Sequence, residues 1–247
     1  MEVHHSHHPT HKKKWTEYLL EFLMLFLAVF LGFVAENLRE GSVEQHRAKE
    51  YMRSLVEDLE ADTANIQGII SLAGEMGKRT ELLVDLINNG IDHNEIVQLY
   101  RLNFITNRVV QVSFEDRTSS QLKNSGSLRM VKNSKIADSI RAYWERIKTI
   151  ENIRDRYAEF GAKASDVAVQ IFNNKYYGKL DPDNPFIFPT IDSSATLVNS
   201  DPKLLVQYSN RKRTQGINLV FYQFNMREAK LQAANLISFI NHEYHFK

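Results

Sequence analysis

One acidic residue lies inside the most apolar stretch of the chain, and it is the first candidate for chemistry. Glu21 is the only charged residue in the run LLEFLMLFLAVFLGFVA at positions 19–35. A carboxyl group in hydrocarbon is costly unless it is protonated or paired, so it can bind a partner or carry a proton. A helix, at about 100° per residue, places four further residues on one stripe with this group. We predict that this stripe is an interaction face: Glu21, Leu25, Ala28, Gly32 and Ala35.

Small residues on this stripe favour close packing against another helix. Ala28 and Gly32 form a small-x-x-x-small pair, and such pairs let two helix backbones approach each other in a membrane. Four phenylalanines form a second stripe, more than a quarter-turn away, that would face lipid: Phe22, Phe26, Phe30 and Phe33. Two simpler explanations stay open, because small pairs also arise by chance and because Glu21 lies near enough to the end of the run to reach the interface.

Five histidines crowd the first eleven residues: His4, His5, His7, His8 and His11. Imidazole groups at this density bind zinc, copper or nickel in solution. A dedicated site also needs fixed geometry and supporting hydrogen bonds, which a short polar tract does not provide. We interpret the tract as an incidental metal binder or a pH-responsive charge beside anionic lipid, and we predict no resident metal.

Familiar catalytic and cofactor motifs are absent from the sequence. It contains no G-x-S-x-G, H-E-x-x-H, P-loop or G-x-G-x-x-G pattern. Ser-x-x-Lys occurs three times, starting at Ser120, Ser200 and Ser209, and three unrelated matches show how little this spacing means alone. We interpret the basic run 211–213 as a solvated face and three aromatic residues as packing groups: Trp144, Tyr176 and Tyr177. The sequence therefore predicts no catalytic residue, no cofactor and no enzyme.

Composition excludes several other classes of protein. The 247 residues include 31 Lys and Arg against 30 Asp and Glu, a formal net charge of +1, so no overall basic field favours nucleic acid. No cysteine is present, which removes disulfide frameworks, thiolate metal sites and cysteine nucleophiles. Only 10 Gly and 5 Pro occur, which favours long helices over a turn-rich β fold.

The apolar run is long enough to cross a membrane. A helix over residues 15–35 would measure roughly 31 Å, against a hydrocarbon core of about 30 Å. A cleaved signal peptide is the main alternative, but cleavage after Ala35 would place Phe33 where a small residue is expected. Three lysines at 12–14 precede the run, whereas Arg39 is the only basic residue in the ten that follow it, and further basic residues begin at position 47. The positive-inside rule predicts a cytoplasmic N-terminus and a C-terminal part outside the cytoplasm.

The rest of the chain shows mostly helical periodicity. Predicted helices cover residues 42–66, 67–89, 92–106, 136–171 and 217–243, the last with four candidate buried residues: Phe221, Phe224, Leu231 and Ile240. A capping box at 118–121 predicts the start of a short helix, and the Asp201-Pro202 pair predicts the start of another. Residues 109–114 form the only β-like run, and the extended loop 178–202 holds four of the five prolines.

These elements predict an all-α fold, in which one N-terminal transmembrane helix is followed by an elongated helical bundle with one Pro-rich loop. The expected division is a His/Lys-rich cytoplasmic tail over residues 1–14, a transmembrane helix over 15–35 and an extracytoplasmic helical domain over 36–247.

Three sequence blocks resemble a family of small membrane proteins of unknown function from Gram-negative bacteria. The first begins at Glu21-Phe-Leu and continues through the apolar run to Asn37 and Glu40. The second is YMRSLVEDLEAD at 51–62, and the third is QLKNSGSLRMVKN at 121–133, followed by a helix with Tyr143-Trp144. The chain departs from the family where Leu20 replaces a glycine and where Leu-Arg, rather than a tryptophan, follows Asn37. The resemblance covers residues 21 to about 160 and implies an anchored helical protein, with no activity, substrate or catalytic residue.

We expect a structural or accessory interaction protein anchored in the bacterial inner membrane, with a periplasmic helical domain. Its expected partners are the lipid bilayer and either a second copy or another membrane protein, bound through the stripe that contains Glu21; nucleic acid is not expected. The alternative is an ion-motive-force transducing subunit in which Glu21 carries protons. Such subunits need a polytopic partner to complete the proton path, which a single span does not supply.

Overall fold

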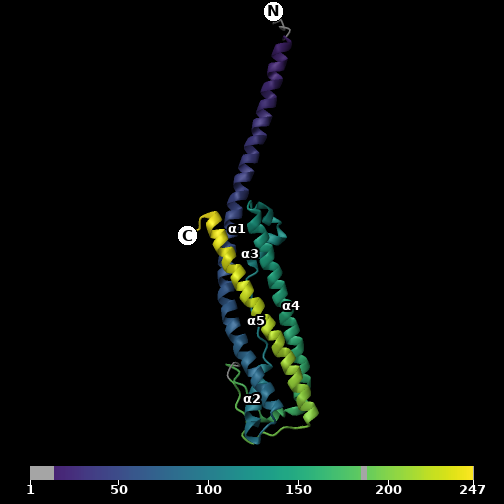
Figure 1. Ribbon diagram of the computed structural model, residues 1–247. Coiled ribbons are helices and arrows are strands. Elements are labelled where there is room, and N and C mark those ends of the chain that lie inside the picture. The colour runs from purple at the N-terminus through teal and green to yellow at the C-terminus, as the bar shows by residue number, and fades with distance from the viewer. Residues whose placement is uncertain (1–13, 185–187, 247) are drawn as a thin grey trace, which may run out of the picture. The chain divides into compact units, whose positions relative to one another are not determined.

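The computed structural model describes residues 14–184 and 188–246 of the chain, and these residues form an all-helical protein (Figure 1). The chain divides into two compact units, Met1–Glu50 and Tyr51–Lys247, and each is described by itself. The five α-helices of the described residues are α1 (Trp15–Asn88), α2 (Ile96–Thr106), α3 (Arg117–Asn124), α4 (Ser134–Ile171) and α5 (Pro202–Tyr244). The predicted fold class, all-α, is confirmed.

The first unit contains the apolar part of α1. Its most apolar window of 18 residues has a mean hydropathy of 2.4, and none of that window is buried. Large side chains along it are exposed, as at Leu25 (69%) and Phe33 (66%). By length and composition, α1 is the one helix among the described residues that could cross a membrane.

Helix α1 continues past both positions where the sequence predicts a new helix to begin. Neither Ser42 nor Gln67 interrupts it, and it ends at Asn88, before Gly90, whose φ of +91° suits the predicted stop. A glycine inside a helix costs only about 1 kcal/mol, and no proline lies between positions 15 and 88. Gly41 and Gly68 are therefore tolerated among strong helix formers, and the predicted boundaries at 42 and 67 are wrong.

The second unit is a helical bundle in which α4 and α5 run antiparallel. Asn133 before α4 donates to Glu243 near the end of α5 (3.0 Å), and Arg146 donates to Asn225 (2.9 Å). One apolar core joins these helices to residues 52–76 of α1, and a second core joins the end of α1 to α2, the end of α4 and the start of α5. Figure 1 shows α2 beside the loop between α4 and α5, at the end of the bundle opposite α3.

The apolar stripe predicted on α4 faces the core. Nine of its eleven positions are buried: Ile136, Ile140, Tyr143, Ile150, Ile153, Tyr157, Ala164, Val167 and Ile171. The other two, Ile147 and Phe160, are half-buried. Spacing by three and four residues thus identified the buried side of this helix correctly.

The stripe predicted for the last helix is wrong at three of its four residues. Ile240 is fully buried, but Phe221, Phe224 and Leu231 are each more than half exposed. The buried side of α5 instead combines large residues, such as Leu219 and Met226, with small or polar ones, such as Ala229 and Ala233. These residues recur every three or four positions, and Phe221, Phe224 and Leu231 lie off that stripe. The predicted helix 217–243 is also part of one helix that begins at Pro202.

Two further predictions for connecting segments change. Residues 109–114 form no strand, because no neighbouring strand is present among the described residues to pair with them. The segment is still buried through Val110 and Val112. Helix α3 starts at Arg117 rather than through a capping box at Thr118, which lies inside the helix. Just before the Pro-rich loop, Asn174–Tyr176 form a short 3-10 turn, and an isolated bridge joins Tyr177 to Ile191 within the described part of the loop.

Candidate functional site

The predicted interaction face lies on α1, within the first unit, and its residues are exposed. This holds for all five: Glu21, Leu25, Ala28, Gly32 and Ala35. A Cβ atom added at Gly32 would meet nothing within 4 Å, so the chain itself leaves room there. The phenylalanine stripe forms on the same helix, with ring centroids 6.4 Å apart for Phe22–Phe26 and 6.0 Å apart for Phe26–Phe30. The two stripes are present as helical faces, and what they contact stays a prediction.

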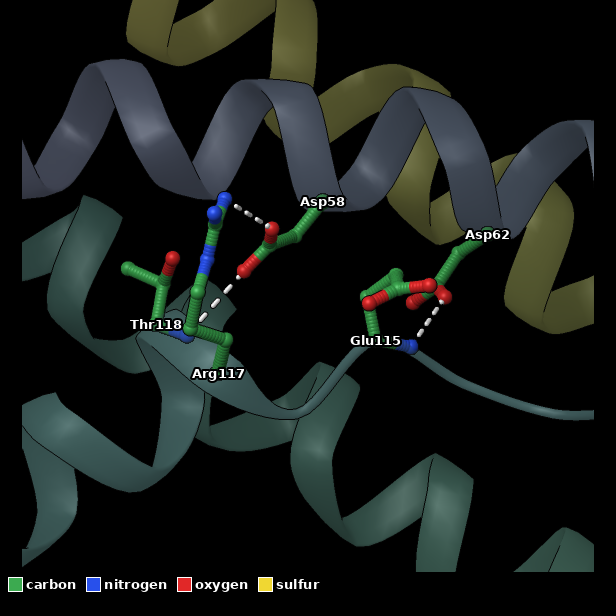
Figure 2. Close-up of polar contacts among 5 residues, drawn as sticks. All are labelled: Asp58, Asp62, Glu115, Arg117 and Thr118. Carbon is green, nitrogen blue, oxygen red and sulfur yellow. Dashed lines mark hydrogen bonds and ion pairs between the residues drawn. The ribbon is translucent and has the colours of Figure 1, made fainter.

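A pair of buried aspartates on α1 holds the segment that leads into α3 (Figure 2). Asp58 Oδ2 accepts a hydrogen bond from the backbone N–H of Thr118 (3.1 Å). Its Oδ1 accepts from Arg117 Nη2 (3.0 Å) in an ion pair whose guanidinium is largely exposed. Asp116, the residue before the helix, gives no side-chain cap. The N-terminus of α3 is therefore capped by a carboxylate from another helix, where the helix dipole favours negative charge.

Asp62, one turn further along α1, holds the neighbouring residues (Figure 2). Its Oδ1 accepts from the backbone N–H of Glu115 (2.8 Å), and its Oδ2 accepts from the hydroxyl group of Tyr143 on α4 (2.8 Å). Burial raises the pKa of Asp62 above its ordinary value of 3.8, while its two hydrogen bonds act in the opposite direction. Burial, followed by the nearby Asp62 carboxylate, also raises the pKa of the Tyr143 hydroxyl. The arrangement ties α1, α4 and the 115–118 segment together.

The second and third sequence blocks meet in this region. Asp58 and Asp62 belong to the second block, and α3 leads into the third block. The indole N–H of Trp144 donates to Ser119 Oγ on α3 (2.8 Å), beside the bond between Tyr143 and Asp62. Every aspartate oxygen here bonds a donor of the protein itself, so we interpret this cluster as structural.

A buried lysine lies at the other end of the bundle. Lys212 on α5 is fully buried, so the predicted solvated face at 211–213 is wrong at this position. Its Nζ donates to Thr106 O (3.1 Å), Asn107 Oδ1 (2.6 Å) and Gln215 Oε1 (3.2 Å), all neutral acceptors. Burial lowers the pKa of the Lys212 amine to about 7. Ser209, which shares its Ser-x-x-Lys spacing, donates instead to Asn88 (2.9 Å).

Asparagine and tyrosine side chains extend this network away from the lysine. Asn107 donates to Asn103 Oδ1 (3.0 Å), which also accepts from the hydroxyl group of Tyr208 (2.7 Å). Asn103 in turn donates to the hydroxyl group of Tyr177 (2.8 Å), which donates to the carbonyl of Tyr100 (3.2 Å). A cavity of about 630 Å³ opens beside Asn103, Asn107 and Tyr177. Asn107 therefore links the two, because it accepts from the Lys212 amine and also lines the cavity.

The aromatic residues singled out in the sequence pack against neighbouring side chains, and Tyr177 also lines the cavity beside Asn103. Trp144 is buried in the core, and Tyr176 and Tyr177 lie edge-on or tilted against Tyr100, with centroids 5.9 and 5.4 Å away. The five N-terminal histidines lie outside the described residues. Among residues 14–184 and 188–246, no group of three or more His, Asp or Glu side chains could hold a metal ion.

The sequence does contain a signal for the buried charges, which is a charged residue at a position where an apolar stripe expects an apolar one. On α1 the core positions run Met52, Leu55, Leu59, Asp62 and Ile66, so Asp62 interrupts an apolar stripe. On α5 the corresponding run is Tyr208, Lys212, Gln215, Leu219 and Tyr222. A charge at a core position of a regular stripe must be paired or hydrogen-bonded, and both of these residues are.

No family model, no curated protein and no solved structure matches the chain. The resemblance to the family of small Gram-negative membrane proteins therefore rests on its sequence blocks alone.

Proposed function

We propose that this chain is a membrane-anchored structural or accessory interaction protein, with α1 as its anchor and the second unit as a periplasmic helical domain. The observation that carries this proposal is the apolar start of α1, where no residue in the most apolar window is buried. Exposed apolar surface on this scale is stable in a bilayer and unfavourable in water.

The interaction we propose is association with a second copy through the stripe that contains Glu21. In lipid there is little hydrophobic drive between helices, so close backbone contact and a hydrogen bond from a carboxyl group must hold them together. The small residues Ala28 and Gly32 permit such contact, and they lie on the side of the helix that carries the acid.

Substitution on the two stripes tests this proposal. Gly32→Leu should lower the crosslinked dimer fraction of the full chain in mild detergent, because leucine fills the space that a second helix would occupy. Phe26→Leu is the matched control on the other stripe and should leave the fraction unchanged. An added Cβ at Gly32 meets nothing within 4 Å in the chain, so no internal clash is expected from this change. Equal effects of both changes, or a strictly monomeric wild type, would contradict the proposal.

Proton transfer through Glu21 is the competing function, and Glu21→Gln separates the two. Glutamine keeps a hydrogen-bonding side chain but cannot carry a proton, so association should persist in this variant. Loss of a cellular function with association intact would favour the ion-motive-force alternative.

A further inference from the structure

Three arginines line a second cavity in the second unit. Arg79 comes from α1, Arg101 from α2, and Arg108 from the segment that follows α2. The cavity has a volume of about 570 Å³, and Arg108 and Pro189 also line the cavity beside Asn103. We call the cavity lined by Arg79, Arg101 and Arg108 the arginine cavity. Its volume lies within the usual range for small-molecule sites, about 300–1,000 Å³.

The described lining of the arginine cavity includes arginine side chains and no acidic side chain. Neither Arg79 nor Arg101 forms an ion pair or side-chain hydrogen bond within the described part of the chain, and both are exposed. Glu75, one turn before Arg79, forms its ion pair with Lys78 (2.9 Å), and the charge of Arg79 has only a smaller effect on this carboxylate. Guanidinium groups gathered in this way bind carboxylate and phosphate groups through charge-assisted hydrogen bonds.

The position of Arg108 is fixed by the protein. Its guanidinium carbon lies 5.5 Å from the centroid of the Phe104 ring, and its carbonyl accepts from the hydroxyl group of Tyr157 (3.3 Å). Phe104 also packs edge-on against Phe188, with centroids 5.1 Å apart. A half-buried arginine held on an aromatic ring loses little freedom when it binds an anion.

Apart from Thr190, the remaining lining residues are apolar. Met76 and Ile105 come from α1 and α2, and Phe188 and Pro189 come from the loop before α5. Such walls suit an aromatic or aliphatic body, whereas a small inorganic ion would leave them in contact with water.

We propose that the arginine cavity binds a small organic anion, in which a carboxylate or phosphate group contacts Arg79, Arg101 and Arg108 and an apolar body lies against Met76, Ile105 and Phe188. This site is independent of the proposed association through α1. The same chemistry is present in a free organic acid and in an anionic lipid, so the experiment separates these two sources.

Binding of 2-naphthoate to the full chain in phosphatidylcholine nanodiscs tests the proposal, with empty nanodiscs as the blank. Isothermal titration should show one saturable site. The uncharged 2-naphthol should bind at least about tenfold more weakly, because it lacks the charge-assisted bonds, and inorganic phosphate should also bind more weakly, because it lacks the apolar body. Nanodiscs that contain anionic phospholipid supply the second arm. Loss of 2-naphthoate binding there assigns the site to a lipid, and retained binding assigns it to a free acid.

Paired variants provide the control. Arg79→Ala with Arg101→Ala should weaken 2-naphthoate binding at least about tenfold. Arg211→Ala with Arg227→Ala removes the same charge from exposed positions of α5 and should leave binding unchanged. Circular dichroism melting checks that each variant is folded. If the double variant is unfolded, Arg101→Ala alone replaces it in the binding experiment. No saturable binding, equally tight binding of 2-naphthol, or equal losses in the two double variants would overturn the proposal.

Discussion

At the scale of single residues, Lys212 couples the stability of the second unit to pH. Its ammonium group has three neutral oxygen acceptors, and no ion pair with a carboxylate is formed within the described chain. Burial lowers the pKa from 10.5 to about 7, so the folded chain binds fewer protons than the unfolded chain between these two values. Stability linked to this group is greatest above pH 10.5, falls as the pH decreases toward 7, and is lost below the folded pKa.

Lys212→Met should therefore flatten the pH dependence of unfolding. We expect the free energy of unfolding of the wild type to rise between pH 7 and pH 9, by up to about 1.4 kcal/mol per pH unit for one proton. The rise should be smaller in Lys212→Met, which has no titratable group at this position. Urea unfolding of the full chain in nonionic detergent, followed by circular dichroism, measures both slopes. Lys203→Met, at an exposed position of the same helix, should keep the wild-type slope.

At the scale of elements, α4 and α5 differ in how their sequences encode the buried face. The α4 stripe is made of large apolar residues, so hydrophobic spacing identifies it. On α5 the large apolar residues Phe221, Phe224 and Leu231 face outward, while the buried side includes Ala229 and Ala233. Hydrophobicity alone ranks phenylalanine above alanine as a core residue, but on α5 the position along the stripe decides which residue is buried, and the stripe also includes Leu219 and Met226.

Two serine substitutions on α5 should therefore have very different effects on stability. Phe224→Ser changes a side chain that is 56% exposed, so we expect it to alter the free energy of unfolding by less than about 1 kcal/mol. Ile240→Ser removes a fully buried side chain and leaves a cavity, which should cost about 2–5 kcal/mol. Thermal and urea unfolding of both variants checks the contrast. Similar losses would show that the outer side of α5 is covered by another molecule in solution.

Elements with local signals could be predicted, whereas the partners of the buried polar groups could not. Helix α2, the α4 stripe and the stop at Gly90 follow from residues close together in the chain. The bond from Thr118 to Asp58 joins residues 60 positions apart, and the bond from Lys212 to Asn107 spans 105. A single sequence shows that a charge at a core position needs a hydrogen-bonding partner, but it does not identify that partner when the two residues are far apart in the chain.

At the scale of the whole molecule, the surface of the helical second unit suits water, whereas the surface of the apolar start of α1 suits lipid. Residues 51–247 bury two apolar cores of their own and expose charged side chains, as expected for a unit in water. The apolar window of α1 buries nothing and is as apolar as a typical membrane span. This contrast supports the proposed anchor, and the side of the membrane that the second unit occupies then depends on the charges that flank the span.

The charge distribution beside the apolar segment predicts that side. Three lysines at 12–14 precede it, and Arg39 is the only basic residue in the ten that follow. Because basic flanks remain in the cytoplasm, we expect the second unit to be on the periplasmic side. Alkaline phosphatase fused after Lys247 should be active, and green fluorescent protein fused at the same site should be dark. Replacing the three lysines by alanine should reduce the phosphatase signal, because it removes the charge difference that sets the orientation. A dark phosphatase fusion with a bright fluorescent one would reverse the proposed topology.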